Sequence, residues 1–396
     1  MNLKQKTGIN IRKTKEKRCE KIMKNERKFP FKAVAALLFV LCFCVLLFRF
    51  GSEALDFFAF TAVKSANLYL PRAAITFSGL DETSEKKTEK KKETKKETEK
   101  TTEKVKSASI TKTPDDISKL MKEAKEKSKN DKKDGAISLW QYTDEGVTDK
   151  FGVVKVKNVN KTQINIEKLL SQKADLSVKK NEPAVLIFHT HTTETYQLVD
   201  RDYYPTDNVT RSEDSARNMV RIGDAICEQL EKAGIGYIHD SKIHDKRYTG
   251  AYDNSRETAV EYLKKNPSIQ VVLDVHRDAV ERTDGTKIRP VATINGKKAA
   301  QIMIISGCQE EGNGLTEFPD WKENLVFALQ LQKTAEENFE GLMRPIYFCP
   351  RMYNMNLTHC SLLLEIGSDS NTLEEAEYSG QCIGNALAKL LKEYEE

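Results

Sequence analysis

The sequence predicts an α/β fold, with a mostly parallel sheet that has helices on both of its faces. Two short apolar runs rich in β-branched residues, 184–188 and 271–275, indicate buried parallel strands. Between them lies a segment of helical character, 216–232, which ends at Gly234. Strands that alternate with helices of this length are typical of βαβ units and a parallel sheet.

A transmembrane helix is expected at 33–50, ahead of this fold. Its apolar run, AVAALLFVLCFCVLLF, has no polar face, and the flanking Lys32 and Arg49 can extend it to the length that a bilayer requires. The basic tail, 1–32, predicts a cytoplasmic amino terminus by the positive-inside rule. A cleaved signal peptide is the alternative, which the long basic lead and the lack of a small-residue cleavage site disfavour.

Two segments separate the anchor from the globular part. Residues 51–80 are moderately apolar and are expected to lie near the membrane, without an assigned function. Residues 81–134 are rich in Lys, Glu and Thr and cannot bury enough apolar surface to offset the entropy of ordering. We therefore expect a charged, disordered tether there, and a catalytic domain at 151–396.

The net charge of +5 does not point to nucleic acid as a partner. The excess of Lys and Arg comes mainly from the tail at 1–32, whereas the tether alternates Lys with Glu and Thr. The globular part therefore has no basic patch that its composition would reveal.

The remaining elements follow from the same patterns of apolar runs and end signals. The expected strands are 184–188, 236–238, 271–275, 301–305, a strand near 346, and 362–366. The expected helices are 216–232, 257–265, 321–339 and 373–394.

Two of the six histidines follow predicted strands directly, His189 after 184–188 and His276 after 271–275. In open α/β sheets, ligand-binding and catalytic groups gather just beyond the carboxyl ends of the strands. A catalytic zinc in a hydrolase takes three protein ligands from His, Asp and Glu and leaves one position for water. We predict a metal-dependent hydrolase with His189 and His276 as zinc ligands.

The third ligand has three candidates. Glu194 shares a loop with His189, whereas Glu213 and Asp214 come just before a predicted helix. Carboxylates in that place also cap helices, and for Glu213 and Asp214 capping is at least as plausible as ligation. The choice among the three stays open at this point.

Glu365 is the best candidate for the general base. It lies inside the apolar run SLLLEIG, where a charge is costly to bury without purpose, and Gly367 then breaks the strand. A salt-bridged structural glutamate is the alternative. Further residues near the expected site are candidates to orient the ligands or to bind substrate: His191, Glu194, Asp214, Arg277, Asp278 and His244.

The cysteines beyond the anchor show no metal-binding spacing. The pair His359-Cys360 suggests a cysteine peptidase as a rival, with His189 or His276 as base. Because Cys360 precedes an apolar strand and cysteine is commonly buried, we expect it in the core instead.

Five sequence blocks follow one another across 151–396: VLIFHTHTTETY, RNMVRIGDAICEQLEKAGIGYIHDSKIHD, AYDNSRETAVEYL, VVLDVHRDAV and SLLLEIGSDSNTLEEA. Together with the anchor and the tether, these blocks resemble the stage II sporulation protein P family. The resemblance implies a peptidoglycan hydrolase that remodels septal cell wall during engulfment in sporulation. It implies both N-acetylmuramoyl-L-alanine amidase and stem-peptide cross-link endopeptidase activity.

The resemblance also implies an amidase-like zinc site. His189 and His276 match the two histidine ligands, and Glu365 matches the late glutamate. Asn218 resembles the start of the helix that follows the middle glutamate, which favours Glu213, or Asp214, as the third ligand.

Further implications concern partners and location. The implied partners are peptidoglycan, the membrane and stage II sporulation proteins D and M, with the catalytic domain outside the cytoplasm at the sporulation septum. Four arginines are candidates to bind stem-peptide carboxylates: Arg211, Arg217, Arg277 and Arg351. A second function class stays open, a non-catalytic peptidoglycan-binding scaffold that recruits and activates the lytic transglycosylase.

Overall fold

The computed structural model of the chain describes residues 112–310 and 317–396. The predicted basic tail, membrane anchor and membrane-proximal segment lie outside the described residues, as does most of the predicted tether. Within the two described ranges, no helix is long and apolar enough to cross a membrane.

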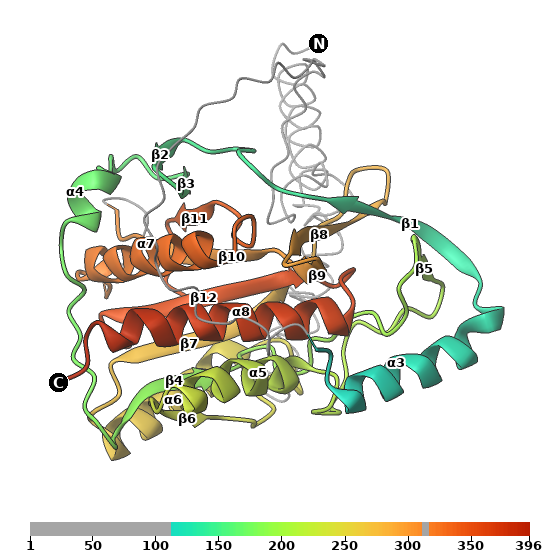
Figure 1. The fold of residues 1–396 in the computed structure, drawn as a ribbon, viewed down its shortest axis with the longest axis horizontal. Coiled ribbons are helices and arrows are strands. Elements are labelled where there is room, and N and C mark those ends of the chain that lie inside the picture. The colour runs from blue at the N-terminus through green and yellow to red at the C-terminus, as the bar shows by residue number, and fades with distance from the viewer. Residues whose placement is uncertain (1–111, 311–316) are drawn as a thin grey trace, which may run out of the picture. The chain divides into compact units, whose positions relative to one another are not determined.

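Strands and helices alternate along most of the described chain (Figure 1). The helices are α3 (Asp115–Lys127), α4 (Ile166–Leu170), α5 (Met219–Lys232), α6 (Ala251–Lys265), α7 (Trp321–Asn338) and α8 (Leu373–Lys392), with a 3-10 turn η2 (Ser128–Asn130). The strands are β1 (Lys133–Trp140), β2 (Asp149–Phe151), β3 (Val154–Asn158), β4 (Pro183–Phe188), β5 (Tyr203–Pro205), β6 (Gly236–His239), β7 (Val271–Asp278), β8 (Lys287–Ile294), β9 (Lys297–Ala300), β10 (Ile302–Gly307), β11 (Ile346–Cys349) and β12 (Cys360–Ser368).

These strands form two mixed sheets. The larger sheet has the order β2-β3-β11-β10-β12-β7-β4-β6, and the smaller has the order β5-β1-β8-β9. Strands β12, β7, β4 and β6 run parallel, as expected, but β10 pairs antiparallel with β12 and β2 pairs antiparallel with β3. The expectation of a mostly parallel sheet is therefore corrected to a mixed α/β arrangement.

A hairpin accounts for the reversed direction of β10. Strands β8 and β9 are joined by Asn295 and Gly296, both with positive φ, which is the signature of a tight hairpin turn. Only Gln301 then separates β9 from β10. With no crossover helix between β7 and β10, nothing carries the chain back to the starting edge for another parallel strand.

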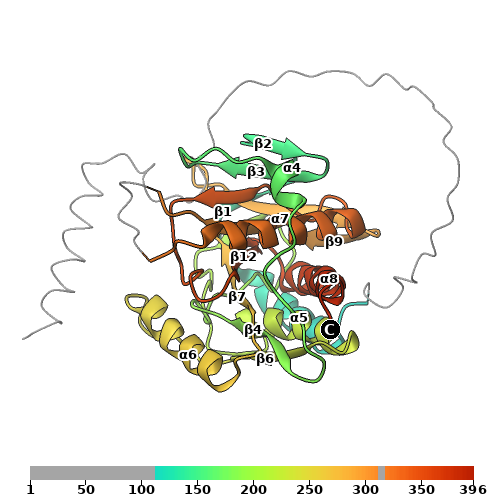
Figure 2. The same cartoon turned by 90° about the vertical axis from the view of Figure 1, so that its left-hand side faces the viewer.

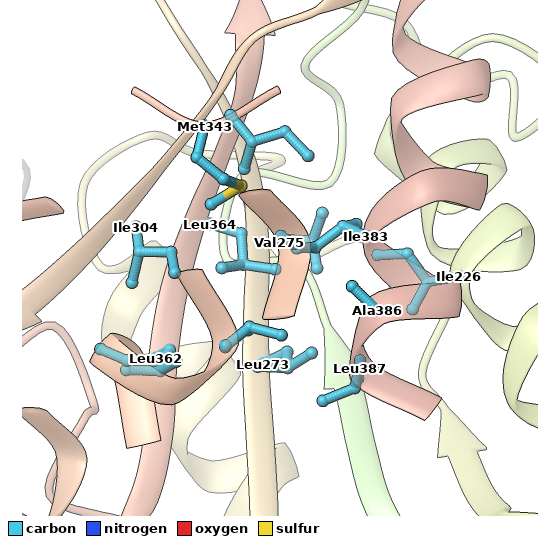
Figure 3. Close-up of a cluster of buried hydrophobic side chains, with 14 of the residues drawn as sticks. Ile226, Leu273, Val275, Ile304, Met343, Leu362, Leu364, Ile383, Ala386 and Leu387 are labelled. Atoms are coloured by element: carbon cyan, nitrogen blue, oxygen red, sulfur yellow. The ribbon is translucent and has the colours of Figure 1, made fainter. Parts of the chain in front are cut away.

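Helices cover both faces of the larger sheet, as the sequence predicted. Figure 2 shows α6 on one side of β4 and β7, with α5 and α8 on the other. The alternation along β4 agrees, since Val185 and Ile187 belong to the main core while Leu186 and Phe188 pack with Ala259 of α6. In the main core, side chains from β7, β10 and β12 meet those of α5 and α8 (Figure 3).

Two element boundaries bear on the site. Helix α5 begins at Met219, not at residue 216, because the Asn218 side chain caps it by accepting from Val220 N. Strand β7 continues past residue 275 to Asp278, so His276 lies within the strand rather than after it.

The last part of the predicted tether, 81–134, is ordered in the structure. Residues 115–127 form α3, which buries Ile117 in the main core, and β1 begins at Lys133. The apolar positions that allow this are too sparse among the charged residues to stand out in the sequence.

Candidate functional site

Three candidate residues converge where β4 and β7 end. Glu194 Oε2 lies 3.7 Å from His276 Nδ1, and the rings of His191 and His276 meet edge to face with centroids 5.4 Å apart. All three side chains are buried. His191 and Glu194 come from the loop after β4, and His276 comes from β7, so the convergence depends on the parallel pairing of β4 with β7.

Glu365 lies beside this group. It occupies the position on β12 that pairs with His276 on β7, just before a bulge at Gly367, which has positive φ. Burial, together with the nearby Asp278 carboxylate, raises the pKa of Glu365 to about 8. Its Oε2 atom is buried without a hydrogen-bond partner among the described residues. A carboxyl group that exchanges its proton near neutral pH can serve as a general acid or base.

Charged neighbours set opposite protonation states at Glu194 and His276. Burial opposes ionisation of Glu194, but Arg277 and His276 hold its pKa at about 2. Burial likewise disfavours charge on His276, yet the Asp274 carboxylate, 2.7 Å from Nε2, holds the pKa of that imidazole well above its usual value. Each charge in the group therefore has a partner of opposite sign.

His189 takes part in a different set of contacts. Its Nδ1 lies 2.9 Å from Val275 O, and its Nε2 lies 2.9 Å from Nε2 of His239. Burial lowers the pKa of His189 to about 3, so the ring is neutral. Gly223 of α5 leaves room for the two rings, because a Cβ atom there would lie 2.8 Å from His189 Nε2.

The predicted zinc ligands His189, Glu213 and His276 are not brought together. Glu213 and Asp214 are exposed, and Asp214 Oδ1 accepts a hydrogen bond from Ala216 N, as a turn residue does. Across the described residues, no group of three or more His, Cys, Asp or Glu side chains is arranged to hold a metal ion. Of the three acidic candidates, only Glu194 lies among histidines.

The residue types in this group are nevertheless those that bind zinc in proteins: His191, Glu194 and His276. The Nδ1 atom of His191 is buried and has no hydrogen-bond partner among the described residues. A buried ring nitrogen without a partner is costly, and a ligand at that point would relieve the cost. The donor types therefore fit zinc, while their spacing is wider than a bound ion requires.

Tyrosines line one side of this group. Tyr248 stacks on His191 with centroids 4.8 Å apart and planes 4° apart, although 69% of Tyr248 is exposed. Tyr252 of α6 lies nearly parallel to His276, at 6.4 Å and 15°. Both tyrosines were missed in the sequence; their four-residue spacing at the start of a helix was the available signal.

The candidate arginines differ in what they contact. Arg277 is buried and donates to the carbonyl oxygens of Thr195 and Thr210, so its role is to fix the two loops. Arg211 is partly exposed, bonds to Asp245, and its Nη2 atom lies 3.6 Å from Glu194 Oε1. The same guanidinium lies against the ring of Tyr248. Arg211 is therefore the arginine placed to meet a ligand.

The other candidates support the backbone around the site. His244 Nδ1 lies 3.0 Å from His189 O, and Asp278 is paired with Arg344 at 2.9 Å. Asp274 was not among the candidates, although a carboxylate inside an apolar strand two positions before His276 would have pointed to it.

Cys360 is a core residue, as expected. It is fully buried at the start of β12, and burial raises the pKa of its thiol well above the usual value. Its neighbour His359 binds Asp175 at the surface. No thiolate–imidazole pair forms here, so this pair does not support a cysteine peptidase.

Comparisons with known proteins agree with the sequence resemblance. Residues 64–388 match the family model described as Stage II sporulation protein P (SpoIIP). Stage II sporulation protein P of Bacillus subtilis (strain 168) is 28% identical over 222 residues, which cover 53% of this chain and 51% of that protein. The match thus spans about half the length of this curated relative.

Two solved structures show a distant likeness. N-acetylmuramoyl-L-alanine amidase AmiC2 of Nostoc punctiforme is 14% identical, with a TM-score of 0.33 over 54% of this chain and 98% of that chain. The CwlD amidase from Clostridioides difficile, solved in complex with the GerS lipoprotein, is 13% identical, with a TM-score of 0.31 over 53% of this chain and 98% of that chain.

Proposed function

The chain belongs to the stage II sporulation protein P family, and we propose that it is a sporulation cell-wall hydrolase. Its proposed substrates are amide bonds of peptidoglycan, cut as an N-acetylmuramoyl-L-alanine amidase and as an endopeptidase on stem-peptide cross-links. The observation that carries this proposal is Glu365, a half-buried residue whose Oε2 atom is buried and whose pKa is near 8, beside His276.

Glu365 is the proposed proton-transfer group. Amide hydrolysis adds a water oxygen to the carbonyl carbon and breaks the C–N bond. Glu365 takes a proton from the attacking water and delivers it to the leaving nitrogen, because its pKa allows both steps near neutral pH.

Zinc is the proposed cofactor, held by His191, Glu194 and His276. When bound, zinc polarises the amide carbonyl and makes water a better nucleophile. Arg277 keeps Glu194 ionised, and Asp274 fixes the side of the His276 ring that faces away from Glu194. Glu194 replaces Glu213 in this proposal, since Glu213 is exposed and Glu194 lies among the histidines.

Substrate contacts are proposed for Tyr248 and Arg211. The exposed ring of Tyr248 beside His191 offers a flat apolar surface, and the adjacent guanidinium can bind a stem-peptide carboxylate. Single-pass membrane anchoring through 33–50, septal localisation during engulfment and association with stage II sporulation proteins D and M remain proposals drawn from the sequence.

The test is the digestion of purified peptidoglycan by the full-length chain, with products identified by mass spectrometry. Three arms are compared: protein with zinc, protein with chelator, and chelated protein resupplied with zinc. Free stem peptides that disappear with chelator and return with zinc are the expected amidase result. Split cross-links under the same controls are the expected endopeptidase result.

Two outcomes would contradict the proposal. Product formation that is unaffected by chelator would show that the reaction does not require zinc. An unchanged wall, with folded protein that has bound zinc, would favour the non-catalytic scaffold that recruits and activates a lytic transglycosylase.

A further inference from the structure

A short turn near the site has an unusual backbone. Tyr353 and Asn354, in the connection between β11 and β12, have φ values of 42° and 60°. Left-handed backbone is costly for residues other than glycine, above all for bulky ones such as tyrosine, and persists where surrounding contacts hold it in place. Two such residues in succession call for contacts that offset the cost.

One set of contacts leads from Tyr353 to His276 through stacked rings. Tyr353 stacks on Tyr252 of α6, with centroids 5.3 Å apart and planes 25° apart. Tyr252 in turn lies nearly parallel to the imidazole of His276. The tyrosines therefore limit how far the His276 ring can tilt out of its plane.

A second set leads from Asn354 to Asp274 through hydrogen bonds. Asn354 Nδ2 lies 3.3 Å from Ser255 Oγ, which lies 2.7 Å from Thr190 Oγ1. Thr190 Oγ1 then donates to Asp274 Oδ2 at 2.6 Å, while its backbone N–H donates to Oδ1. All four residues are buried, so water does not compete for these bonds.

The chemistry of the groups fixes the direction of the two outer hydrogen bonds of this chain. An ionised carboxylate only accepts, so the Thr190 hydroxyl proton points at Asp274. The Ser255 hydroxyl accepts from the amide of Asn354, whose nitrogen only donates. Its single proton is shared between Thr190 Oγ1 and the carbonyl oxygen of Tyr252. The Thr190 hydroxyl and the Asn354 amide therefore both donate in the direction of Asp274.

Asp274 transmits this order to His276. Its Oδ1 lies 2.7 Å from His276 Nε2 and forms an ion pair with the ring, although the angles at this contact do not meet those of a hydrogen bond. The carboxylate is held instead by Thr190, and its position decides which ring nitrogen faces Glu194. A carboxylate that turned freely would let the ring turn with it.

We propose that the Tyr353–Asn354 turn is a positioning element that fixes the orientation of the His276 imidazole through these two sets of contacts. Through Tyr252 the turn limits the tilt of the His276 ring, and through Asp274 it limits the rotation of that ring. The inference rests on the proposed function only in assigning His276 to the active site.

The test compares variants that break the hydrogen-bond chain with a matched control in the same loop. Asn354→Gly keeps the left-handed backbone and removes the amide, and Ser255→Ala breaks the chain without touching the turn. The control is Asn356→Ala, because Asn356 shares the partner Arg256 with Asn354 but makes no contact with Ser255.

The readout is the imidazole N–H signal of His276 in metal-free, substrate-free protein labelled with 15N-histidine. The chain has six histidines, so the spectrum is simple, and His276→Gln assigns the signal. We expect a slowly exchanging signal in the wild type and in Asn356→Ala. In Asn354→Gly and Ser255→Ala we expect it to shift and to exchange faster.

Kinetics on peptidoglycan supply the second readout. We expect kcat to fall about 10- to 100-fold in Asn354→Gly and Ser255→Ala, with KM nearly unchanged, as for residues that orient a catalytic ligand. A His276 signal identical to wild type in both variants would overturn the inference. If Asn354→Gly fails to fold, Ser255→Ala decides alone. An inactive wild type would contradict the proposed function and leave the spectroscopic test intact.

Discussion

Glu365 on β12 lies directly beside His276 on β7, because the two residues occupy paired positions of adjacent parallel strands. The pairing brings a carboxyl group of raised pKa to the one histidine that also contacts Glu194 and Asp274. The proposed chemistry requires these residues to lie together. They come from two apolar runs that are far apart in the sequence, and they meet only because the two strands pair.

Zinc binding by variants of Glu194 and Glu213 tests which of the two glutamates is the acidic zinc ligand. We expect Glu194→Gln to weaken zinc binding by about 100-fold or more, since even residues that only orient ligands change affinity by about 10- to 100-fold. Glu213→Gln should bind zinc as the wild type does, because Glu213 is exposed. Zinc titration of both variants measures the difference, and the reverse order would restore Glu213 as the ligand.

Tyr248 is expected to act on substrate binding and not on stability. Its ring is 69% exposed, so Tyr248→Ala should leave the unfolding midpoint close to that of the wild type. Loss of one stacking contact, worth about 0.5–1.5 kcal/mol, should raise KM about 2- to 10-fold. Tyr248→Phe should behave as the wild type, and steady-state kinetics on soluble muropeptides distinguishes these cases. Equal KM values for the alanine and phenylalanine variants would remove Tyr248 from the substrate site.

The raised pKa of Glu377 predicts that the free energy of unfolding depends on pH, independently of the candidate site. Burial raises the pKa of this α8 carboxyl group to about 7 from 4.5, although Arg221 opposes the shift. The folded state therefore holds the proton more tightly than the unfolded state. This contribution is full below pH 4.5 and is lost as the pH rises through about 7, amounting to about 3 kcal/mol.

Urea unfolding between pH 4.5 and pH 8 checks this expectation. Glu377→Gln cannot titrate, so its stability should vary less across that range than the stability of the wild type. Arg221 keeps a partner in the variant, since it also pairs with Asp116 of α3. Parallel pH profiles for the two proteins would show that Glu377 does not titrate in the folded chain as described.

The junction between the smaller sheet and α8 depends on a buried ion pair. Arg289 of β8 is fully buried and binds both carboxylate oxygens of Glu375 in the first turn of α8. Arg289→Met leaves that carboxylate without its partner and should cost about 3–5 kcal/mol of unfolding free energy. The control is Lys298→Met, since Lys298 shares the partner Asp200 but is exposed, and its loss should cost less than about 1 kcal/mol. Denaturant titration that gave equal costs would contradict this account.

Much of the larger sheet could be predicted from the sequence. The strands that carry the site, β4, β7 and β12, are continuous apolar runs, and both ends of α5 carry capping signals at Asn218 and Gly234. Glu365 was identifiable because it is the single charge within the apolar run of β12. These features are local, so no knowledge of tertiary contacts was needed.

The smaller sheet was missed for a physical reason. Its strand β1 is largely exposed and polar, and it gains its place by pairing with β5 and β8, which are distant in sequence. The Asn295-Gly296 pair between β8 and β9 was a usable hairpin signal. Non-local pairing of polar strands leaves little periodicity to detect.

Which of the two histidines after β4 lies against His276 was also beyond the sequence. Both follow the same apolar run, and in a continued strand two residues at this spacing would share one face. The chain instead leaves β4 after Phe188 and turns at His191, which directs the two rings differently. His189 contacts His239 and Gly223 of α5, while His191 contacts His276. Which ring faces His276 therefore depends on the exact residue at which β4 ends.

The role of Glu365 in proton transfer is tested by the rate at which Glu365→Gln releases stem peptides from peptidoglycan, measured beside Glu377→Gln. Both variants replace a carboxyl group of raised pKa by an amide, but only Glu365 lies beside His276. We expect release to fall about 100- to 10,000-fold in Glu365→Gln with no loss of thermal stability, and to stay nearly at the wild-type rate in Glu377→Gln. Wild-type release by Glu365→Gln would contradict this role.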